Sequence, residues 1–569
     1  MINVQQTLTS KVPTIANMPK LFQIPIVATV RALVHEHDIN TFLKKNSHLD
    51  AFDFIEKTLE YFNFSYKTVQ SQIENIPKTG RVVIIANHPL GALDALSLID
   101  MVKNIRQDIK VVANSVLSEI EPIKDILIEI DTFDKKVSKE SIKKVYESLE
   151  NDEAVIIFPS GEVSRARANG IKDTKWNSGF LKFATKTQSP ILPVFIKAKN
   201  SALFYTISTI NKGLSTLLLP HEMFKKRNKT LEFRIGKLIP YKSYANIDVD
   251  NKTKVKLFKK HLYKIAKGKK GIFKGVKSIA HPVDRKLLKD ELKDAKLLGE
   301  TNDGKKIYLY DYENKSNLLK EIGRLRELTF RKVEEGTGKK RDNDEYDIYY
   351  KHIILWDEEQ LEIVGSYRIG ESSYIYDNFG VDGFYTNTLF KFNKEFLPYL
   401  SNSIELGRSF VQPKYWGSRA LDYLWQGIGA YLKEHPNIKY MFGPVSISSA
   451  LPKDAINLIV YYYDLYYGDK SNLVSPILPF KLNIEEISEL QKIFKGDDER
   501  EDFVTLKRQL SYYNATVPTL YKQYTDLCED GGVKFLGFNI DRDFNDSIDG
   551  MILVDIDKIK PKKRQRYIK

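Results

Sequence analysis

The chain has 569 residues, of which 42% are hydrophobic and 28% charged, so it has room for two globular domains and is not a disordered polypeptide. Its single cysteine, Cys528, excludes an intrachain disulfide framework and a cysteine-based metal cluster, as is usual in the cytosol. The formal net charge of +14 favours anionic partners, and the absence of an apolar run of 18 residues argues against a membrane-spanning helix.

Residues 21–34 form an apolar segment with few charges near the start of the chain. Two interpretations stay open: the segment rests in the interface of a bilayer, or it packs on the core of its own domain. The N-terminus lacks the basic, apolar and small-residue regions of a secretory signal. We therefore expect a cytoplasmic protein that is peripheral on the inner face of the cytoplasmic membrane.

Positive charge gathers in three blocks, at residues 225–227, 252–277 and 560–569. Such blocks bind anionic lipid headgroups, nucleic acid or an acidic carrier protein, although about half of these residues are expected to be only solvated surface. No nucleic-acid-binding motif accompanies the charge, so we expect an anionic membrane surface and no nucleic acid as partner.

Strand-like apolar runs alternate with helical stretches over the first ~280 residues, which is typical of an α/β fold with a mostly parallel sheet flanked by helices. A basic segment at about 264–290 then breaks the pattern. We place the domain boundary near residue 285, with one domain at 1–285 and a second α/β domain at 286–569.

Two of the predicted strands, at residues 82–86 and 154–158, lead into polar motifs at the edge where α/β folds place their chemistry. In the first motif, His88 can take a proton from a hydroxyl group and Asp94 can orient the imidazole. Pro89 and Gly91 predict a turn before a helix that begins near residue 93. The alternative is that His88 is an ordinary loop histidine and Asp94 a charge at a helix N-terminus.

The second motif, at residues 158–165, offers three side chains or backbone positions for substrate binding. Gly161 lets the chain turn, Glu162 supplies a carboxylate, and Arg165 supplies a guanidinium suited to phosphate or carboxylate oxygens. Together the two motifs resemble the glycerolipid acyltransferase family, whose signature is a His and an Asp four residues apart followed by a Phe-Pro-Glu-Gly segment. Here five residues separate His88 from its aspartate, and Ser160 replaces the glutamate of the signature.

The resemblance extends to two further segments. Residues 130–136 stand where the family has a segment that contacts the acyl acceptor, and residues 189–194 stand where it has its last apolar strand. The resemblance implies an O-acyltransferase domain over residues 1–285 with a catalytic histidine and aspartate. It assigns no catalytic role to residues 189–194.

The second half of the chain has a helix at 318–331, an acidic-polar loop at 339–347, and strands at 351–356 and 362–369. Two motifs follow this order, Val364-Gly365-Ser366-Tyr367-Arg368 and Glu405-Leu406-Gly407-Arg408. This arrangement resembles the acetyltransferase-like N-acyltransferases, in the branch with acyl-homoserine-lactone synthases and the ornithine or glycine lipid synthases.

In that branch the Glu-Leu-x-Arg strand faces the reacting amine. Chemically, Glu405 can accept a proton from an α-ammonium group and Arg408 can hold a carboxylate. The alternative is a structural ion pair between the two on one strand. Residues 412–419 lack the Arg-x-x-Gly-x-Gly loop of acetyl-CoA enzymes, which is compatible with a long-chain acyl carrier as donor.

The two halves together resemble the bifunctional aminolipid synthases. This implies N-acylation of ornithine or glycine with a 3-hydroxyacyl chain, followed by O-acylation of the hydroxyl group of that lyso-lipid. The donor is an acyl-carrier-protein or coenzyme A thioester, and we expect no tightly bound cofactor and no metal. Two alternatives stay open: a lysophospholipid or glycerol-phosphate O-acyltransferase with a non-catalytic second domain, and a non-enzymatic membrane-binding protein.

Overall fold

The computed structural model describes residues 4–5, 18–114, 117, 120–130, 138–167, 170–210, 212–312 and 314–568. The chain forms two compact units, Met1–Ser278 and Ile279–Lys569. The division falls inside the basic segment at 264–290, a few residues before the expected boundary at 285. Each unit is described by itself below.

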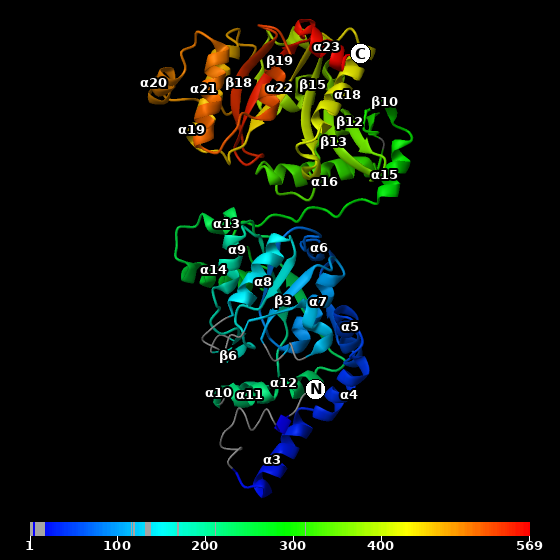
Figure 1. Ribbon diagram of the computed structural model, residues 1–569, viewed down its shortest axis with the longest axis vertical. Helices are drawn as coiled ribbons and strands as arrows, with labels where there is room; N and C mark the ends of the chain where they lie inside the picture. The colour runs from blue at the N-terminus through cyan, green and yellow to red at the C-terminus, as the bar shows by residue number, and fades with distance from the viewer. Residues whose placement is uncertain are drawn as a thin grey trace. The chain divides into compact units, whose positions relative to one another are not determined.

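The first unit is built on a seven-stranded sheet (Figure 1). The strands in spatial order are β1 (Ser65–Lys67), β9 (Thr230–Ile235), β8 (Ile191–Lys197), β2 (Val82–Ala86), β5 (Ala154–Ile157), β3 (Ile109–Ala113) and β4 (Leu127–Glu129). Neighbouring strands are parallel except for β8 and β9, which are antiparallel. The predicted mostly parallel sheet is therefore confirmed.

Every side chain of the central strands β2 and β5 is buried, because helices cover both faces of this sheet. Successive strand residues point to opposite faces. Ile84 accordingly packs in one core cluster and Val83 in another. The first cluster includes residues of α5 (Ala51–Tyr61) and α7 (Ala92–Lys103), and the second includes α8 (Lys139–Glu150), α9 (Gly179–Lys186) and α14 (Asn251–Ile265).

Helix α3 (Lys20–Leu33) contains most of the apolar segment predicted at residues 21–34, and it extends away from the sheet (Figure 1). Val27 is buried, whereas Leu21, Phe22 and Ile24 are 79%, 62% and 67% exposed. The end of α3 instead packs beside a cluster that includes α10 (Ala202–Ile210). The segment thus contacts its own unit with one end and leaves apolar side chains exposed at the other.

The remaining elements of the first unit are short. They are α4 (Glu36–Asn46), α6 (Gln70–Ile73), η2 (Glu121–Ile126), β6 (Arg165–Arg167), β7 (Gly170–Lys172), α11 (Lys212–Leu217), α12 (Leu219–Phe224) and α13 (Lys242–Ala245). Across the described residues of the whole chain, the helices are too short or too polar to cross a bilayer.

The second unit is built on an eight-stranded sheet (Figure 1). Its strands in spatial order are β10 (Lys296–Glu300), β11 (Lys306–Tyr310), β12 (Lys351–Asp357), β13 (Glu362–Glu371), β15 (Ser403–Val411), β16 (Tyr440–Ile447), β19 (Ser547–Asp555) and β18 (Val533–Asp541). Neighbours are antiparallel except for β15 and β16, which are parallel. This α/β unit agrees with the predicted fold class.

Strands β15 and β16 separate partway along their length. They pair only from Ser403 to Glu405, although β15 continues to Val411 and β16 continues to Ile447. At the point of separation, a Cβ atom on Gly443 would lie 2.0 Å from the Leu406 carbonyl oxygen, so only glycine fits this close approach. Beyond this point each of the two strands continues without backbone pairing to the other.

Helices also cover this second sheet. Helix α16 (Asn317–Lys332) packs on Ile354 and Trp356 of one face. On the other face, α18 (Ala420–Glu434) packs on Ile353 and Leu355 of β12, and α19 (Lys453–Tyr467) packs on β18. The other elements are α15 (Arg285–Leu292), η3 (Glu345–Ile348), α17 (Ser372–Phe379), η4 (Val381–Gly383), η5 (Tyr385–Thr388), β14 (Phe390–Phe392), η6 (Leu397–Asn402), η7 (Pro413–Tyr415), β17 (Val474–Pro476), α20 (Ile484–Ile493), α21 (Glu499–Tyr512), α22 (Thr519–Thr525), η8 (Ile556–Lys558) and α23 (Pro561–Tyr567).

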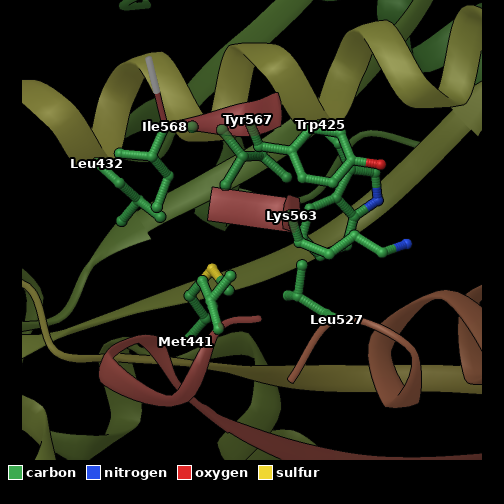
Figure 2. Close-up of a pocket in the computed structure, with 10 residues that line it drawn as sticks. Trp425, Leu432, Met441, Leu527, Lys563, Tyr567 and Ile568 are labelled. Carbon is green, nitrogen blue, oxygen red and sulfur yellow. The ribbon is translucent and has the colours of Figure 1, made fainter. Parts of the chain in front are cut away.

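A small apolar cavity lies between α18 and the C-terminal helix α23, lined in part by Trp425, Met441 and Tyr567 (Figure 2). Its volume of about 10 Å³ corresponds to roughly one water molecule. The cavity is therefore a gap in core packing and has no room for an acyl chain.

Candidate acyl-transfer sites

The first candidate site lies where β2 ends and α7 begins. His88 follows this strand, and its Nδ1 atom lies 3.2 Å from Oδ1 of Asp94 in the first turn of α7. Gly91 takes a φ of +101°, which allows the turn to contain five residues between the histidine and the aspartate. The structure thus brings together the two side chains that were predicted to act as a pair.

The Asp94 carboxylate is completely buried and fixed by backbone donors. Its two oxygens accept hydrogen bonds from the backbone N–H groups of Leu90, at 2.7 Å, and Ala95, at 2.8 Å. Its contact with the His88 ring has the distance of an ion pair, but its alignment falls outside hydrogen-bond geometry.

The His88 ring is largely buried, with 19% of its side chain exposed, and lies 4.4 Å from the ring of Phe158 in the second motif. Burial opposes the charged imidazolium, but the carboxylates of Asp94 and Asp173 favour it more strongly and raise the pKa of His88 above its ordinary value. A histidine of this kind holds a proton well after accepting it, which suits a general base.

Hydrogen bonds fix the loop that carries His88. The Asn87 side chain bonds to both backbone groups of Ile196 on β8, so it extends the pairing of β2 and β8 by one residue. The Ser164 N–H donates to the His88 carbonyl oxygen at 2.7 Å, which joins the two sequence motifs directly. The strand exits therefore form one site.

Asp173 is a residue of this site that the sequence did not reveal. Its carboxylate accepts hydrogen bonds from Ser164 Oγ at 2.6 Å, Trp176 Nε1 at 2.9 Å and the His88 backbone N–H at 3.2 Å. Burial raises the pKa of Asp173 despite these bonds. It holds the His88 loop against the second motif, and no sequence pattern around it indicates this role.

The second motif places its predicted binding residues as follows. Gly161 has a φ of +63°, and the Glu162 side chain is 24% exposed. The Arg165 guanidinium is buried and donates to Ser208 Oγ at 2.8 Å and Ser215 Oγ at 2.6 Å. In this structure Arg165 thus holds α10 and α11 to the motif, and its predicted role in substrate binding stays a prediction.

The segment at 130–136, expected to contact the acyl acceptor, lies outside the described residues except for Ile130. The segment at 189–194 forms the start of β8, as the apolar pattern predicted.

The second candidate site lies on one face of the eight-stranded sheet, where β15 and β16 separate. Glu405 is 2% exposed, and one oxygen accepts hydrogen bonds from Thr386 N at 2.7 Å and Thr386 Oγ1 at 2.6 Å. The other oxygen accepts a hydrogen bond from the Tyr350 hydroxyl group. Burial raises the pKa of Glu405, although these bonds oppose the shift.

Arg408 lies at a bulge in β15, with a φ of +50° that is strained for a residue with a side chain. Its Nε atom is 3.3 Å from Asp342 Oδ2 and its Nη2 atom is 3.2 Å from Asp344 Oδ2. The rings of Tyr385 and Phe544 each lie 4.4 Å from its guanidinium carbon. Glu405 and Arg408 therefore have separate partners instead of the mutual ion pair considered from the sequence.

Arg408 is connected through Asp344 to a buried network of ion pairs. Asp347 lies 2.8 Å from Arg326 and 3.0 Å from Arg368, and Arg368 also contacts Asp344. The two arginines outweigh the burial that opposes ionisation and hold the pKa of Asp347 well below its usual range. In the parts of the chain that the structure describes, His, Cys, Asp and Glu side chains form no group of three that could hold a metal ion.

Comparison with known proteins gives two different matches along the chain. Residues 6–268 match the acyltransferase family, and residues 325–426 match the acetyltransferase (GNAT) domain family. The two matched segments correspond to the two units of the structure.

Curated relatives divide in the same way. The chain is 34% identical over 307 residues to the glycine N(alpha)-acyltransferase of Phocaeicola vulgatus, covering 52% of this chain and 93% of that protein. It is 29% identical over 226 residues to the lyso-glycine lipid O-acyltransferase of the same organism, covering 38% of this chain and 80% of that protein. Over 119 residues it is 34% identical to the L-ornithine N(alpha)-acyltransferase of Brucella abortus, covering 20% of this chain and 41% of that protein.

Proposed function

This chain is an acyltransferase that belongs to the glycine N(alpha)-acyltransferase family, and from that premise we propose that it makes an aminolipid in two steps, one in each unit. The second unit joins a 3-hydroxyacyl chain to the amino group of glycine or ornithine. The first unit then acylates the 3-hydroxyl group of that product. Glycine is favoured, because the chain covers 93% of the length of the Phocaeicola vulgatus glycine N(alpha)-acyltransferase and 41% of the length of the ornithine relative.

The N-acylation step takes place where β15 and β16 separate. Glu405 and Arg408 lie on β15 at this point, and the amine attacks the thioester carbonyl carbon of the donor. The carbon–nitrogen bond forms, the carbon–sulfur bond breaks, and the thiol leaves. The donor is an acyl-carrier-protein or coenzyme A thioester, which we place beside the unpaired parts of β15 and β16.

The O-acylation step takes place at His88. A hydroxyl group is a poor nucleophile until a base removes its proton, and the imidazole beside Asp94 supplies that base. The oxygen attacks the thioester carbonyl carbon, the thiol leaves, and the imidazolium returns its proton to the sulfur. The observation that carries this proposal is the 3.2 Å approach of the two side chains at the end of a buried strand.

Both substrates of the second step carry long chains, so we place the first unit on an anionic membrane surface at the inner face of the cytoplasmic membrane. The exposed apolar side chains at the start of α3 support this location, since they gather at one end of a helix. The net charge of +14 favours anionic lipid headgroups.

The test uses the purified full chain with glycine, a 3-hydroxyacyl thioester and a long-chain acyl thioester, and mass spectrometry of the lipid products. The wild-type protein should form the diacylated glycine lipid, and His88→Ala should accumulate the N-monoacylated lyso-lipid. His48→Ala, at an exposed histidine of the same unit, should behave as wild type.

Two outcomes contradict the proposal. If the wild-type chain forms no N-acylated amino acid with either class of donor, it is a single O-acyltransferase or a binding protein. If His88→Ala forms the diacylated product at the wild-type rate, the first unit does not use this histidine as its base.

A further inference from the structure

Asp549 lies on the same face of the second sheet as Glu405, and it forms an acidic cluster with Asp541 and Glu335. Because side chains alternate along a strand, Asp549 shares a face of β19 with Met551 and Leu553, which pack in one cluster with Phe442. Asp549 stands opposite Ser446 in the pairing of β19 with β16. Strand β16 therefore lies between Asp549 on β19 and Glu405 on β15.

The Asp549 carboxylate is buried; the Ser446 hydroxyl group interacts with it, but one of its oxygens is left open. The residue is 3% exposed, and its Oδ1 atom has no hydrogen-bond partner among the described residues. Buried polar atoms are nearly always paired, so the open Oδ1 atom of Asp549 is available to accept a hydrogen bond from an incoming donor. Asp541 differs, because the backbone N–H groups of Asp543 and Phe544 donate to it.

The charges around Asp549 are mostly negative. Asp541 and Glu335 act on it as negative charges, and Arg408 acts on it as a positive charge. That arginine is already compensated by Asp342 and Asp344. Burial and the neighbouring carboxyl groups raise the pKa of Asp549, and burial raises the pKa of Glu335 to about 7.

Glu405, in contrast, already accepts hydrogen bonds at both of its carboxylate oxygens. It accepts hydrogen bonds from Tyr350 and from both donors of Thr386, so it holds η5 against β15. An incoming ammonium group would have to displace these bonds before it reached the Glu405 carboxylate. Asp549 requires no such displacement.

Resting on the proposed N-acylation, we propose that this acidic cluster binds the α-ammonium group of the amino-acid acceptor and that Asp549 is the base that removes its proton. The nitrogen of the resulting amine forms a bond to the thioester carbonyl carbon, the carbon–sulfur bond breaks, and the second nitrogen proton leaves with the thiol. Arg408 lies near the same cluster and receives the acceptor's carboxylate. Glu405 is then a positioning residue that fixes η5 against β15.

The test measures thiol release and N-acylglycine formation by the full chain as a function of pH. Asp549→Asn should lower kcat/KM for glycine about 100-fold or more at pH 7.5, a typical contribution of a general base. The rate of the variant should recover as pH rises, because solution then supplies more of the neutral amine. The groups that also titrate around this site are Asp541, Glu335 and Tyr385, and none is changed in the variant.

The matched control is Asp546→Asn, at an exposed aspartate in the turn between β18 and β19 whose φ of +60° asparagine tolerates. It should keep wild-type kinetics. Thermal unfolding of Asp549→Asn should match that of the wild type, which separates loss of the base from loss of the fold.

The results separate the two proposals. If the wild type N-acylates glycine and Asp549→Asn stays within threefold of it at every pH, the assignment of this base is wrong and the proposed function stands. If Glu405→Gln instead shows the loss at pH 7.5 with recovery at high pH, Glu405 is the base. If the wild type forms no N-acyl product, the proposed function itself fails.

Discussion

The substitution Asp94→Asn tests the first site with little change of shape. The carboxylate lies 3.2 Å from His88 Nδ1, and two unit charges at that distance attract by about 5 kcal/mol at an effective dielectric constant of about 20. This value is an upper limit, because the imidazolium carries only part of its charge in the transition state. Since 1.36 kcal/mol corresponds to a tenfold change in rate, we expect kcat/KM for O-acylation to fall about 10²- to 10⁴-fold.

The substitution should also move the pH profile of O-acylation in a defined direction. Asp94 raises the pKa of His88 in the wild type, whereas burial acts in the opposite direction. Without the carboxylate, burial dominates, so the pH below which O-acylation is lost should move downward in Asp94→Asn. A merely structural role for this aspartate would lower activity without moving that pH.

The free energy of unfolding should depend on pH for the same reason, the raised pKa of His88. A raised pKa of His88 stabilises the fold fully below the pKa of the unfolded histidine, and this stabilisation is lost as pH rises through the folded pKa. The substitution should therefore cost more free energy of unfolding at pH 5 than at pH 9.

The assay compares initial rates of O-acylation of a synthetic N-(3-hydroxyacyl)glycine across pH 5 to 9, with N-acylation of glycine measured in parallel. N-acylation should stay within twofold of wild type. Asp125→Asn, at an exposed carboxylate of the same unit, is the control. An O-acylation rate within threefold of wild type, with an unmoved pH profile, would refute the pairing of the two residues as a catalytic unit.

Three further predictions concern other parts of the chain. Gly443→Ala places a Cβ atom 2.0 Å from the Leu406 carbonyl oxygen, so thermal unfolding should show loss of about 2 kcal/mol or more in the second unit and N-acylation should fall; unchanged unfolding would contradict the close approach. Arg165→Met removes hydrogen bonds to Ser208 and Ser215, so the first unit should lose about 1–3 kcal/mol by denaturant unfolding; an unchanged midpoint would mean that these bonds do not stabilise α10 and α11. Replacing the exposed apolar residues of α3, which are Leu21, Phe22 and Ile24, with serine should weaken sedimentation with anionic vesicles at least tenfold without changing unfolding. Equal sedimentation of variant and wild type would place the membrane contact elsewhere.

The sequence predicted the elements whose apolar pattern is strong. Residues 82–86 are apolar throughout and form a strand buried on both faces, and the following turn leads into a helix that begins at Ala92, one residue before the expected position. The contact of His88 with Asp94 was also predictable, because a turn with glycine absorbs the additional residue between them. Such short-range features depend on local patterns that a single sequence contains.

Contacts between distant residues were not predictable in the same way. Asp173 lies 85 positions after His88, and only the folded chain shows that it accepts a hydrogen bond from the backbone of that residue. The partners of Arg408 were missed for a related reason. Asp342 and Asp344 lie in a loop that was predicted to be polar surface, but the structure buries Asp342 and half-buries Asp344 against the arginine.

The two sites present different bases because their nucleophiles differ in acidity. A hydroxyl group keeps its proton until attack begins, so its base must accept a proton in the transition state and then return it to the leaving thiol; an imidazole with a fixed carboxylate suits both tasks. An ammonium group loses its proton before attack, so its base needs only negative charge and a pKa raised toward that of the amine. The buried carboxylate of Asp549, with its open Oδ1 atom, has both properties, whereas both oxygens of Glu405 already accept hydrogen bonds.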